Sequence, residues 1–355
     1  MLPTNKKISV LHPFINKKWW AVSMMIYLSD FLSKNNNDVT LFTFSYNKQI
    51  FPSKNKVIVF KNSKLVSFIK IAYYIRNSDY IIIWNSPMQF VWVFSKIFFR
   101  SKAKIIWWHH HYPWYYSGNT NVFILLKRLL EKISIKNIDS LIVNSKYLQD
   151  SIKEIYGIDS KILYPVLDSK FLNYENKNKI LKSNTIFSYG RRAEWKNLDL
   201  VFQAYDSLKN KTRDLVFIIW WEWPELNFYK KKYEADKDVT FLWLVDKNQI
   251  IESLEKSKIF LFPSKIDSFW LVILESMSIW VPVISFNISW AKEIINNWVN
   301  WYLVDSDSEF IEKTYEILFN SSQDNNYYIE CLKTAHTFWE ENFMKNLLNI
   351  FNTMK

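Results

Sequence analysis

Two carboxylates, Asp267 and Glu275, stand eight positions apart around a short apolar run in the second half of the chain. Ionised carboxylates accept hydrogen bonds from hydroxyl groups, and each such bond contributes roughly 1.5–3 kcal/mol. Glu275 could therefore hold a ribose diol, and Asp267 could reach the hydroxyls of a sugar. The alternative is structural: Asp267 would cap a loop, and Glu275 would lie on a helix surface. Apolar neighbours, Leu274 and Met277, indicate a partly buried helix and favour a functional Glu275.

Two cations, Arg191 and Lys196, follow a predicted strand at residues 186–189 and precede a predicted helix at residues 198–208. In such a loop, cations and backbone N–H groups can bind phosphate oxygens together. Arginine offers a bidentate fork and lysine a mobile point charge. In a reaction that expels a nucleotide diphosphate, both would stabilise the negative charge of the leaving group. The residues alone leave open the alternative that both are solvated surface cations.

Three consecutive histidines, His109, His110 and His111, follow a predicted strand at residues 104–108. Adjacent residues of a strand point to opposite faces, and no nearby cysteine, aspartate or glutamate completes a ligand set. We therefore predict no metal site here. A histidine at the carboxyl end of a central strand is better placed to form hydrogen bonds in a cleft.

Short apolar strands alternate with helices along the whole chain, from a strand at residues 8–11 to a closing helix at residues 338–351. This alternation predicts an α/β protein with two doubly wound, Rossmann-like domains and not a single barrel. A length of 355 residues also favours two domains. We place the first domain at residues 1–167 and the second at residues 168–337, with a linker rich in lysine and asparagine at residues 168–184.

The glycine content is abnormally low. Average usage of roughly 7% predicts about 25 glycines, whereas the chain has 3 glycines and 18 tryptophans. Several tryptophans stand where turns are expected and the backbone should need glycine. We hypothesise that most of them are glycines encoded by UGA codons and read as tryptophan. The alternative is a genuine tryptophan-rich protein that stacks carbohydrate.

Charge is distributed unequally. Residues 1–165 hold 23 lysines and arginines against 8 aspartates and glutamates, a net charge of +15. The remainder holds 23 against 26, a net charge of −3. This asymmetry predicts that the first half faces an anionic surface or acceptor. A gene rich in A and T, which favours lysine codons, is the alternative explanation.

Composition also restricts the compartment. The one cysteine, Cys331, excludes a disulfide framework and suits a reducing cytoplasm. The start of the chain lacks the apolar core of a signal peptide, and no run approaches the roughly 18 apolar residues of a membrane span. The aromatic segment at residues 90–100 could lie on a membrane surface or simply pack on a sheet. We expect a cytoplasmic protein, peripheral at the inner membrane face.

With glycine substituted at the tryptophans, the second half resembles the GT-B glycosyltransferases of family 4, the glycogen-synthase-like retaining group. The first half is similar through Trp19-Trp20, His111-Tyr112-Pro113 and Val-Asn-Ser (143–145). The segments that match in the second half are Tyr-Gly-Arg…Lys-Asn-Leu (189–198), Ile-Ile-Trp-Trp-Glu-Trp-Pro-Glu-Leu (218–226), Val-Thr-Phe-Leu-Trp-Leu-Val (239–245), Phe-Pro-Ser…Asp-Ser-Phe-Trp-Leu-Val-Ile-Leu-Glu-Ser-Met (262–277), Trp-Val-Pro-Val-Ile (280–284) and Glu-Ile-Ile-Asn-Asn-Trp-Val-Asn-Trp-Tyr-Leu-Val (293–304).

The resemblance implies a nucleotide-sugar bound in a cleft between the two domains, with the closing helix (338–355) packed back on the first. Arg191 and Lys196 would hold the diphosphate and Glu275 the ribose. Asp267 would bind the donor sugar, and His111 would contact that sugar near its reacting carbon. The remaining donor-binding candidates are Trp19, Trp20, Gly190, Glu222, Trp223, Ser268, Phe269, Trp270 and Leu271. Such transfer retains the anomeric configuration and needs no metal or other cofactor.

Two departures from the family pattern stand out. The family has glutamate at both ends of its Glu-x7-Glu motif, whereas Asp267 is shorter by one methylene, which could alter donor choice. Genuine tryptophans at Trp19, Trp20 and Trp270 would place indoles in the diphosphate loops and inactivate the enzyme. Trp270 in particular would crowd the donor pocket.

The resemblance implies transfer of a sugar from a UDP- or GDP-linked donor to a glycan or a lipid-linked acceptor, in the synthesis of cell-surface polysaccharide or glycolipid. The expected partners are the nucleotide-sugar, this acceptor and an anionic membrane surface, with no nucleic acid. One alternative is a GT-B relative such as a nucleotide-sugar epimerase. Another is a non-enzymatic protein that binds carbohydrate or nucleic acid on tryptophan platforms.

Overall fold

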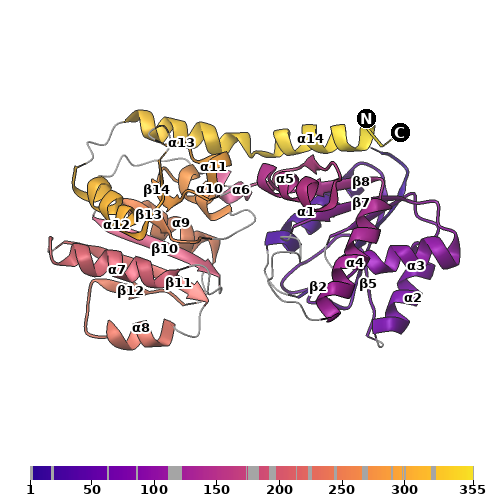
Figure 1. The fold of residues 1–355 in the computed structure, drawn as a ribbon, viewed down its shortest axis with the longest axis horizontal. Helices are drawn as coiled ribbons and strands as arrows, with labels where there is room; N and C mark the ends of the chain where they lie inside the picture. Colours follow the sequence, from indigo (N-terminus) through magenta and orange to yellow (C-terminus); the bar gives the residue numbers. More distant parts are fainter. Residues whose placement is uncertain are drawn as a thin grey trace. The chain divides into compact units, whose positions relative to one another are not determined.

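The structure is a computed structural model that describes residues 3–16, 20–61, 64–84, 87–110, 122–172, 174, 184–191, 197–212, 214–222, 226–243, 246–265, 271–288, 291–297, 299, 301–320 and 325–354. The chain forms two compact units. Unit 1 comprises Met1–Pro165 and Phe343–Lys355, and unit 2 comprises Val166–Asn342. Each unit contains its own parallel sheet with helices packed on it (Figure 1).

Seven parallel strands form the main sheet of unit 1, in the spatial order β5-β3-β1-β6-β7-β8-β9. The central strands are apolar along their whole length because helices cover both faces of a parallel sheet. His109 pairs with Val143, so β7 and β8 end at the same edge. The strands are β1 (Lys7–Leu11), β3 (Asp38–Thr43), β5 (Lys56–Val59), β6 (Tyr80–Ile83), β7 (Lys104–His109), β8 (Ser140–Val143) and β9 (Lys161–Ile162), beside a small sheet of β2 (Phe14–Ile15) and β4 (Ser45–Tyr46).

Helices provide the crossovers that parallel pairing requires. They are α1 (Trp20–Lys34), α2 (Lys64–Ile75), α3 (Gln89–Phe99), α4 (Val122–Lys136) and α5 (Lys146–Tyr156). The buried residues of α2, α3, α4 and α5 pack with the strands in one core cluster. The ends of α5 show why it starts and stops where it does. The Ser145 hydroxyl accepts a hydrogen bond from the Leu148 N–H (3.1 Å), and Gly157 takes a left-handed conformation (φ 69°).

The last helix, α14 (Glu340–Asn352), contacts unit 1 through aromatic rings. Phe343 lies 5.8 Å from Tyr27 and 5.9 Å from Trp108 between ring centroids, and Phe351 lies 5.4 Å from Tyr80. These contacts explain why the residues from Phe343 onward belong to unit 1. The helix predicted from residue 338 begins at Glu340.

Six parallel strands form the sheet of unit 2, in the order β12-β11-β10-β13-β14-β15. They are β10 (Thr185–Arg191), β11 (Val216–Glu222), β12 (Val239–Phe241), β13 (Ile259–Phe262), β14 (Val283–Phe286) and β15 (Tyr302–Val304). The helices are α6 (Ser169–Leu172), α7 (Leu198–Lys209), α8 (Leu226–Lys232), α9 (Lys247–Lys256), α10 (Leu271–Ser278), α11 (Ala291–Ile294), α12 (Asp307–Tyr315) and α13 (Asn325–Thr337), with a π-helical turn at Glu316–Asn320.

Two parallel sheets with helical crossovers confirm the predicted α/β class with two Rossmann-like halves. The linker predicted at residues 168–184 is partly wrong. Its first residues form the short helix α6, and Phe171 of that helix is only 1% exposed. The buried side chain of Phe171 packs this short helix into unit 2.

Candidate functional site

Part of the predicted donor site lies outside the described residues. The residues concerned are Trp19, His111, Lys196, Trp223, Asp267, Ser268, Phe269 and Trp270. The structure gives the backbone positions of Trp20, at the start of α1, and of Gly190, Arg191, Glu222 and Leu271. Glu275 is described with its side chain and contacts.

Three of the predicted residues that are described in unit 2, Gly190, Arg191 and Glu222, lie at the carboxyl edge of its sheet. Gly190 and Arg191 end β10 and pair in register with Trp221 and Glu222 at the end of β11. Strand β13 pairs with β10 on the other side, and α10, which Leu271 begins, follows β13 along the chain. Ligands of open α/β sheets bind outside the carboxyl ends of the strands. The fold therefore brings Arg191, Glu222 and the start of α10 to the edge where a nucleotide would bind.

Glu275 is held by a residue that the sequence did not single out. The hydroxyl of Tyr189, on β10, donates a hydrogen bond to the Oε2 of Glu275, on α10. Burial raises the pKa of Tyr189 well above its usual range, and the Glu275 charge and hydrogen bond raise it further. The phenol therefore remains a proton donor, and it fixes one oxygen of a half-buried carboxylate at the predicted nucleotide edge.

The signal for Tyr189 was its place directly before Gly190 in the Tyr-Gly-Arg motif. It lies in a stack of aromatic rings, 5.1 Å from Phe187 and 5.2 Å from Phe260 between centroids. A tyrosine buried this deeply needs a partner for its hydroxyl. The sequence could predict that a buried Tyr189 needs a hydrogen-bond partner. It could not predict that this partner is Glu275, which is 86 positions away.

The end of α10 adopts the geometry of a Schellman motif. The N–H of Trp280 donates to the carbonyl of Met277 (3.0 Å), and the N–H of Val281 donates to the carbonyl of Ser276 (3.0 Å). Trp280 occupies the left-handed position of this motif, with φ 62°. Glycine usually stands at this position because it lacks a Cβ that would clash.

Trp301 is a second tryptophan with a glycine-like backbone. Its φ of 135° lies in a region that side chains strongly disfavour. Its indole is buried and donates to the Sγ of Cys331. Trp280 and Trp301 lie in two of the segments, 280–284 and 293–304, that match the family when glycine is substituted at the tryptophans.

The carboxyl edge of the unit 1 sheet holds a buried acid–histidine pair. The Nε2 of His109, the last residue of β7, lies 2.8 Å from the Oε1 of Glu131 on α4, and both side chains are at most 5% exposed. His110 follows, buried and in ring contact with Trp84 and Trp108. His111 comes next in the chain, so its predicted role stays a prediction.

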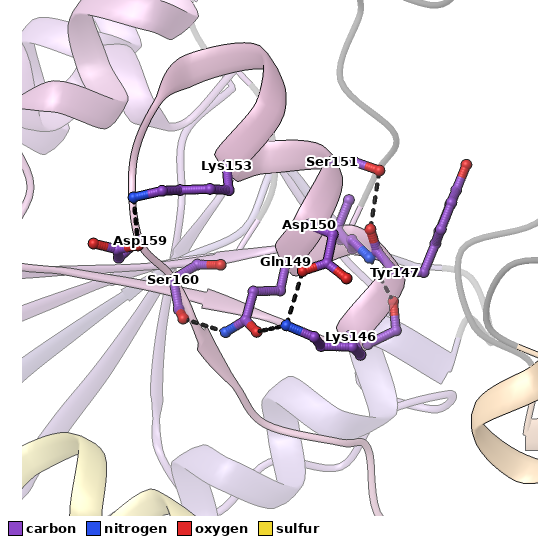
Figure 2. Close-up of polar contacts among 10 residues, drawn as sticks. Lys146, Tyr147, Gln149, Asp150, Ser151, Lys153, Asp159 and Ser160 are labelled. Carbon is purple, nitrogen blue, oxygen red and sulfur yellow. Dashed lines mark hydrogen bonds and ion pairs between the residues drawn. The ribbon is translucent and has the colours of Figure 1, made fainter.

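Helix α5 starts at the same edge, immediately after the Val-Asn-Ser segment (143–145). Polar contacts fix its exposed side to the chain that leads into β9 (Figure 2). Gln149 donates to the carbonyl of Ser160 (2.6 Å), and Lys153 pairs with Asp159 (2.7 Å). These two contacts join α5 to the segment that precedes β9.

Within the described ranges, no three histidine, cysteine, aspartate or glutamate side chains gather as a metal site would require.

Two families match adjacent parts of the chain. The family described as Glycosyltransferase Family 4 matches residues 21–169, and the family described as Glycosyl transferases group 1 matches residues 170–331. Together these matches span both halves in the order of the fold. The chain belongs to the family 4 glycosyltransferases.

Named relatives agree with this assignment. The chain is 21% identical over 334 residues to an uncharacterized glycosyltransferase of Haemophilus influenzae, covering 90% of this chain and 92% of the relative. It is 30% identical over 155 residues to the uncharacterized glycosyltransferase YqgM of Bacillus subtilis, covering 42% of each. Both relatives are glycosyltransferases by name, in keeping with a transferase enzyme.

Solved structures establish the fold. The chain is similar to Anabaena HepE in complex with UDP and glucose, with a TM-score of 0.79 at 14% identity over 98% of this chain and 100% of that one. It is also similar to a glycosyltransferase from Rickettsia africae, with a TM-score of 0.77 at 17% identity over 99% of each. The two Rossmann-like halves are those of a GT-B glycosyltransferase. The predicted family, fold and enzyme class are confirmed.

Proposed function

We propose that this glycosyltransferase moves a sugar, with retention of its anomeric configuration, from a UDP- or GDP-linked donor to a glycan or lipid-linked acceptor. The observation that supports this most directly is Glu275, held by Tyr189 at the carboxyl edge of the unit 2 sheet. A carboxylate fixed there can accept hydrogen bonds from a ribose diol. UDP is the more strongly supported nucleotide, since HepE, of the same fold, was solved with UDP and with UDP-glucose.

Each of the five residues predicted to act in catalysis has a role in this proposal. Glu275 holds the ribose, Arg191 and Lys196 hold the diphosphate, and Asp267 binds the donor sugar. The bond from the anomeric carbon to the diphosphate oxygen breaks, and the acceptor hydroxyl forms its bond on the same face. The departing phosphate takes the proton of that hydroxyl, and His111 contacts the sugar beside the reacting carbon. The cations stabilise the charge that develops on the leaving group.

The acceptor and its location belong to the same proposal. The net charge of +15 on residues 1–165 suits an anionic membrane carrying a lipid-linked acceptor, because basic residues near such a surface gain about 1 kcal/mol each. We place the enzyme at the cytoplasmic face of that membrane, in cell-surface polysaccharide or glycolipid synthesis. In the part of the chain that is described, no helix has both the length and the apolarity to span a bilayer.

The alternative of exposed tryptophan platforms finds little support. Among the described tryptophans, Trp84, Trp92, Trp107, Trp108 and Trp301 are buried, while Trp243 is the only one among the exposed large hydrophobic residues. Stacking platforms need accessible ring faces along one groove.

A nucleotide-release assay with UDP- and GDP-sugars tests the proposal. It compares the tryptophan-containing chain with a glycine form, made from a synthetic gene that encodes glycine at Trp19, Trp20, Trp223 and Trp270. We expect the glycine form to release nucleotide, faster when acceptor is present, and its Glu275→Ala variant to lose at least about tenfold in kcat/KM. Absence of turnover and of binding with every donor would remove the support for the assignment. Turnover that never needs an acceptor and leaves no glycoside product would favour an epimerase.

A further inference from the structure

Exposed apolar side chains concentrate on three helices of unit 1. Of the fifteen large apolar side chains that are exposed among the described residues, ten lie on α2, α3 and α4, and these ten are 42–66% exposed. Single exposed apolar residues are normal on a protein surface, whereas a continuous apolar patch marks an interaction site. The ten residues are Leu65, Val66, Ile69, Tyr73 and Tyr74 of α2, Ile97 and Phe98 of α3, and Leu125, Leu129 and Ile133 of α4.

These residues form stripes along their helices. Leu65, Ile69 and Tyr73 follow one another at intervals of four on α2, and Leu125, Leu129 and Ile133 do the same on α4. Side chains four positions apart lie on the same face of a helix. The opposite faces are already buried: Ile71, Val91 and Ile135, for example, pack in the core of unit 1. Each helix therefore has apolar residues on two sides, one facing the sheet and one facing solvent.

The three helices are neighbours (Figure 1), with α3 in contact with α2. The hydroxyl of Ser95, on α3, donates to the carbonyl of Ala72, on α2 (3.1 Å). The rings of Tyr73 and Phe99 meet edge to face at 5.6 Å. Helix α4 packs against α3 in turn. We call the exposed apolar residues of α2, α3 and α4, with the exposed lysines Lys70, Lys96, Lys132 and Lys136, the basic-apolar surface.

The charges on these helices are almost all of one sign. They carry seven basic residues: Lys64, Lys70, Lys96, Lys127, Arg128, Lys132 and Lys136. Their one carboxylate, Glu131, is buried against His109 and does not offset this charge at the surface. Two copies of this chain meeting through the same surface would bring like charges together. An anionic bilayer instead offers both complementary charge and an apolar interior.

We propose that the basic-apolar surface docks unit 1 on an anionic lipid bilayer. The apolar stripes would enter the headgroup region, and the lysines would contact lipid phosphates, so the helices lie on the membrane and do not span it. This proposal rests on the proposed function, because docking would bring the enzyme to a lipid-linked acceptor. Membrane binding itself can be measured without measuring sugar transfer.

Flotation of the full chain with vesicles tests the proposal. We expect binding to vesicles of phosphatidylcholine and phosphatidylglycerol at low salt, and a loss of at least about tenfold in about 1 M salt, where the screening length falls to about 3 Å. Two double variants should each lose at least about tenfold in partitioning: Ile97→Ser with Phe98→Ser, and Lys132→Glu with Lys136→Glu. Matched controls on α8 of unit 2, Phe228→Ser and Lys231→Glu, should bind as the unchanged chain does, because Phe228 is equally exposed (67%) but lies outside the surface.

Three results would overturn the proposal. They are failure to bind anionic vesicles, equal binding to pure phosphatidylcholine at all salt concentrations, and unchanged binding by both double variants. Sedimentation velocity adds a fourth: a dimer that the Ile97 and Phe98 changes convert to monomer would assign the surface to a second copy. Nucleotide release from a soluble donor is measured in parallel. Both measurements use the glycine form. Normal release without vesicle binding refutes the docking surface alone, and vesicle binding without release refutes the proposed reaction alone.

Discussion

The hydroxyl of Tyr189 provides a single-atom test of the donor site. Because it fixes one oxygen of Glu275, the Tyr189→Phe variant should let that carboxylate rotate away from the ribose. We expect the KM for the nucleotide-sugar to rise by about tenfold, the lower end of what a hydrogen bond to a charged group contributes. Ribose binding is the same in ground and transition states, so kcat should change little. Steady-state kinetics with varied donor measure both constants.

A matched control lies elsewhere in unit 2. The hydroxyl of Tyr205 donates to the Oδ2 of Asp236 at 2.8 Å, so Tyr205→Phe also removes a hydroxyl–carboxylate bond. It should leave the donor KM unchanged. If Tyr189→Phe lowers only the melting temperature and leaves KM alone, its hydroxyl supports the core and does not position Glu275.

Trp280 tests the glycine hypothesis at one backbone position. It adopts φ 62° in the Schellman motif that ends α10 and is half-buried. A left-handed conformation is unfavourable by about 1–2 kcal/mol for a residue with a Cβ, so Trp280→Gly should raise the free energy of unfolding by about 1 kcal/mol. Trp107→Gly, in the extended strand β7 where the indole is buried, should instead lose about 3–5 kcal/mol. Urea denaturation measures both changes in the free energy of unfolding. Sequencing the gene is an independent test, because a TGG codon at Trp280 would argue against glycine at this position.

Among the elements, α4 contacts β7 through a buried pair of side chains. Glu131 and His109 are 2.8 Å apart and nearly inaccessible to solvent. Removing one member of a buried pair leaves the other without its partner, which destabilises a protein by about 3–5 kcal/mol. We expect Glu131→Ala to lose about 3 kcal/mol of stability and Glu131→Gln, which can still form a hydrogen bond, to lose less. A Glu131→Ala chain within about 0.5 kcal/mol of the original would show that other contacts hold α4.

Elements were predictable where a local pattern decides them. The apolar run before Glu275 predicted the helix that is α10, and alternating strands and helices predicted both sheets. Long-range pairing was not predictable. Tyr189 reaches Glu275 because β10 lies beside β13, which precedes α10, and no spacing in the sequence specifies that neighbour. The basic-apolar surface was predictable only in part. The aromatic segment at residues 90–100, which overlaps α3, was a candidate for a membrane surface. The exposed stripe of α2 was not predictable, since apolar residues on two faces of a helix do not reveal which face meets the sheet.

The molecule as a whole combines two units of different charge. Residues 1–165, which make up most of unit 1, carry +15, and the rest of the chain carries −3. The positive charge is therefore concentrated on unit 1, the part that we propose to bind an anionic membrane. The residues that we propose to bind the ribose and the diphosphate lie in unit 2. This division means that membrane attachment and donor binding can be measured and altered separately.

Hydrogen exchange can localise donor binding within the molecule. Amide hydrogens exchange through local openings, and a ligand that binds only the closed site makes those openings rarer by a factor of about 1 + [L]/Kd. At a ligand concentration of about a hundred times Kd, exchange slows by about a hundredfold. We expect UDP, added to the glycine form, to protect peptides of β10, β11 and α10 most strongly, because Arg191, Glu222 and Glu275 lie there. Peptides of α2 and α3 should exchange unchanged, and Glu275→Ala should remove the protection at matched UDP. Protection that appears only in peptides of β1 and β6 would place the nucleotide in unit 1 and contradict the proposed donor site.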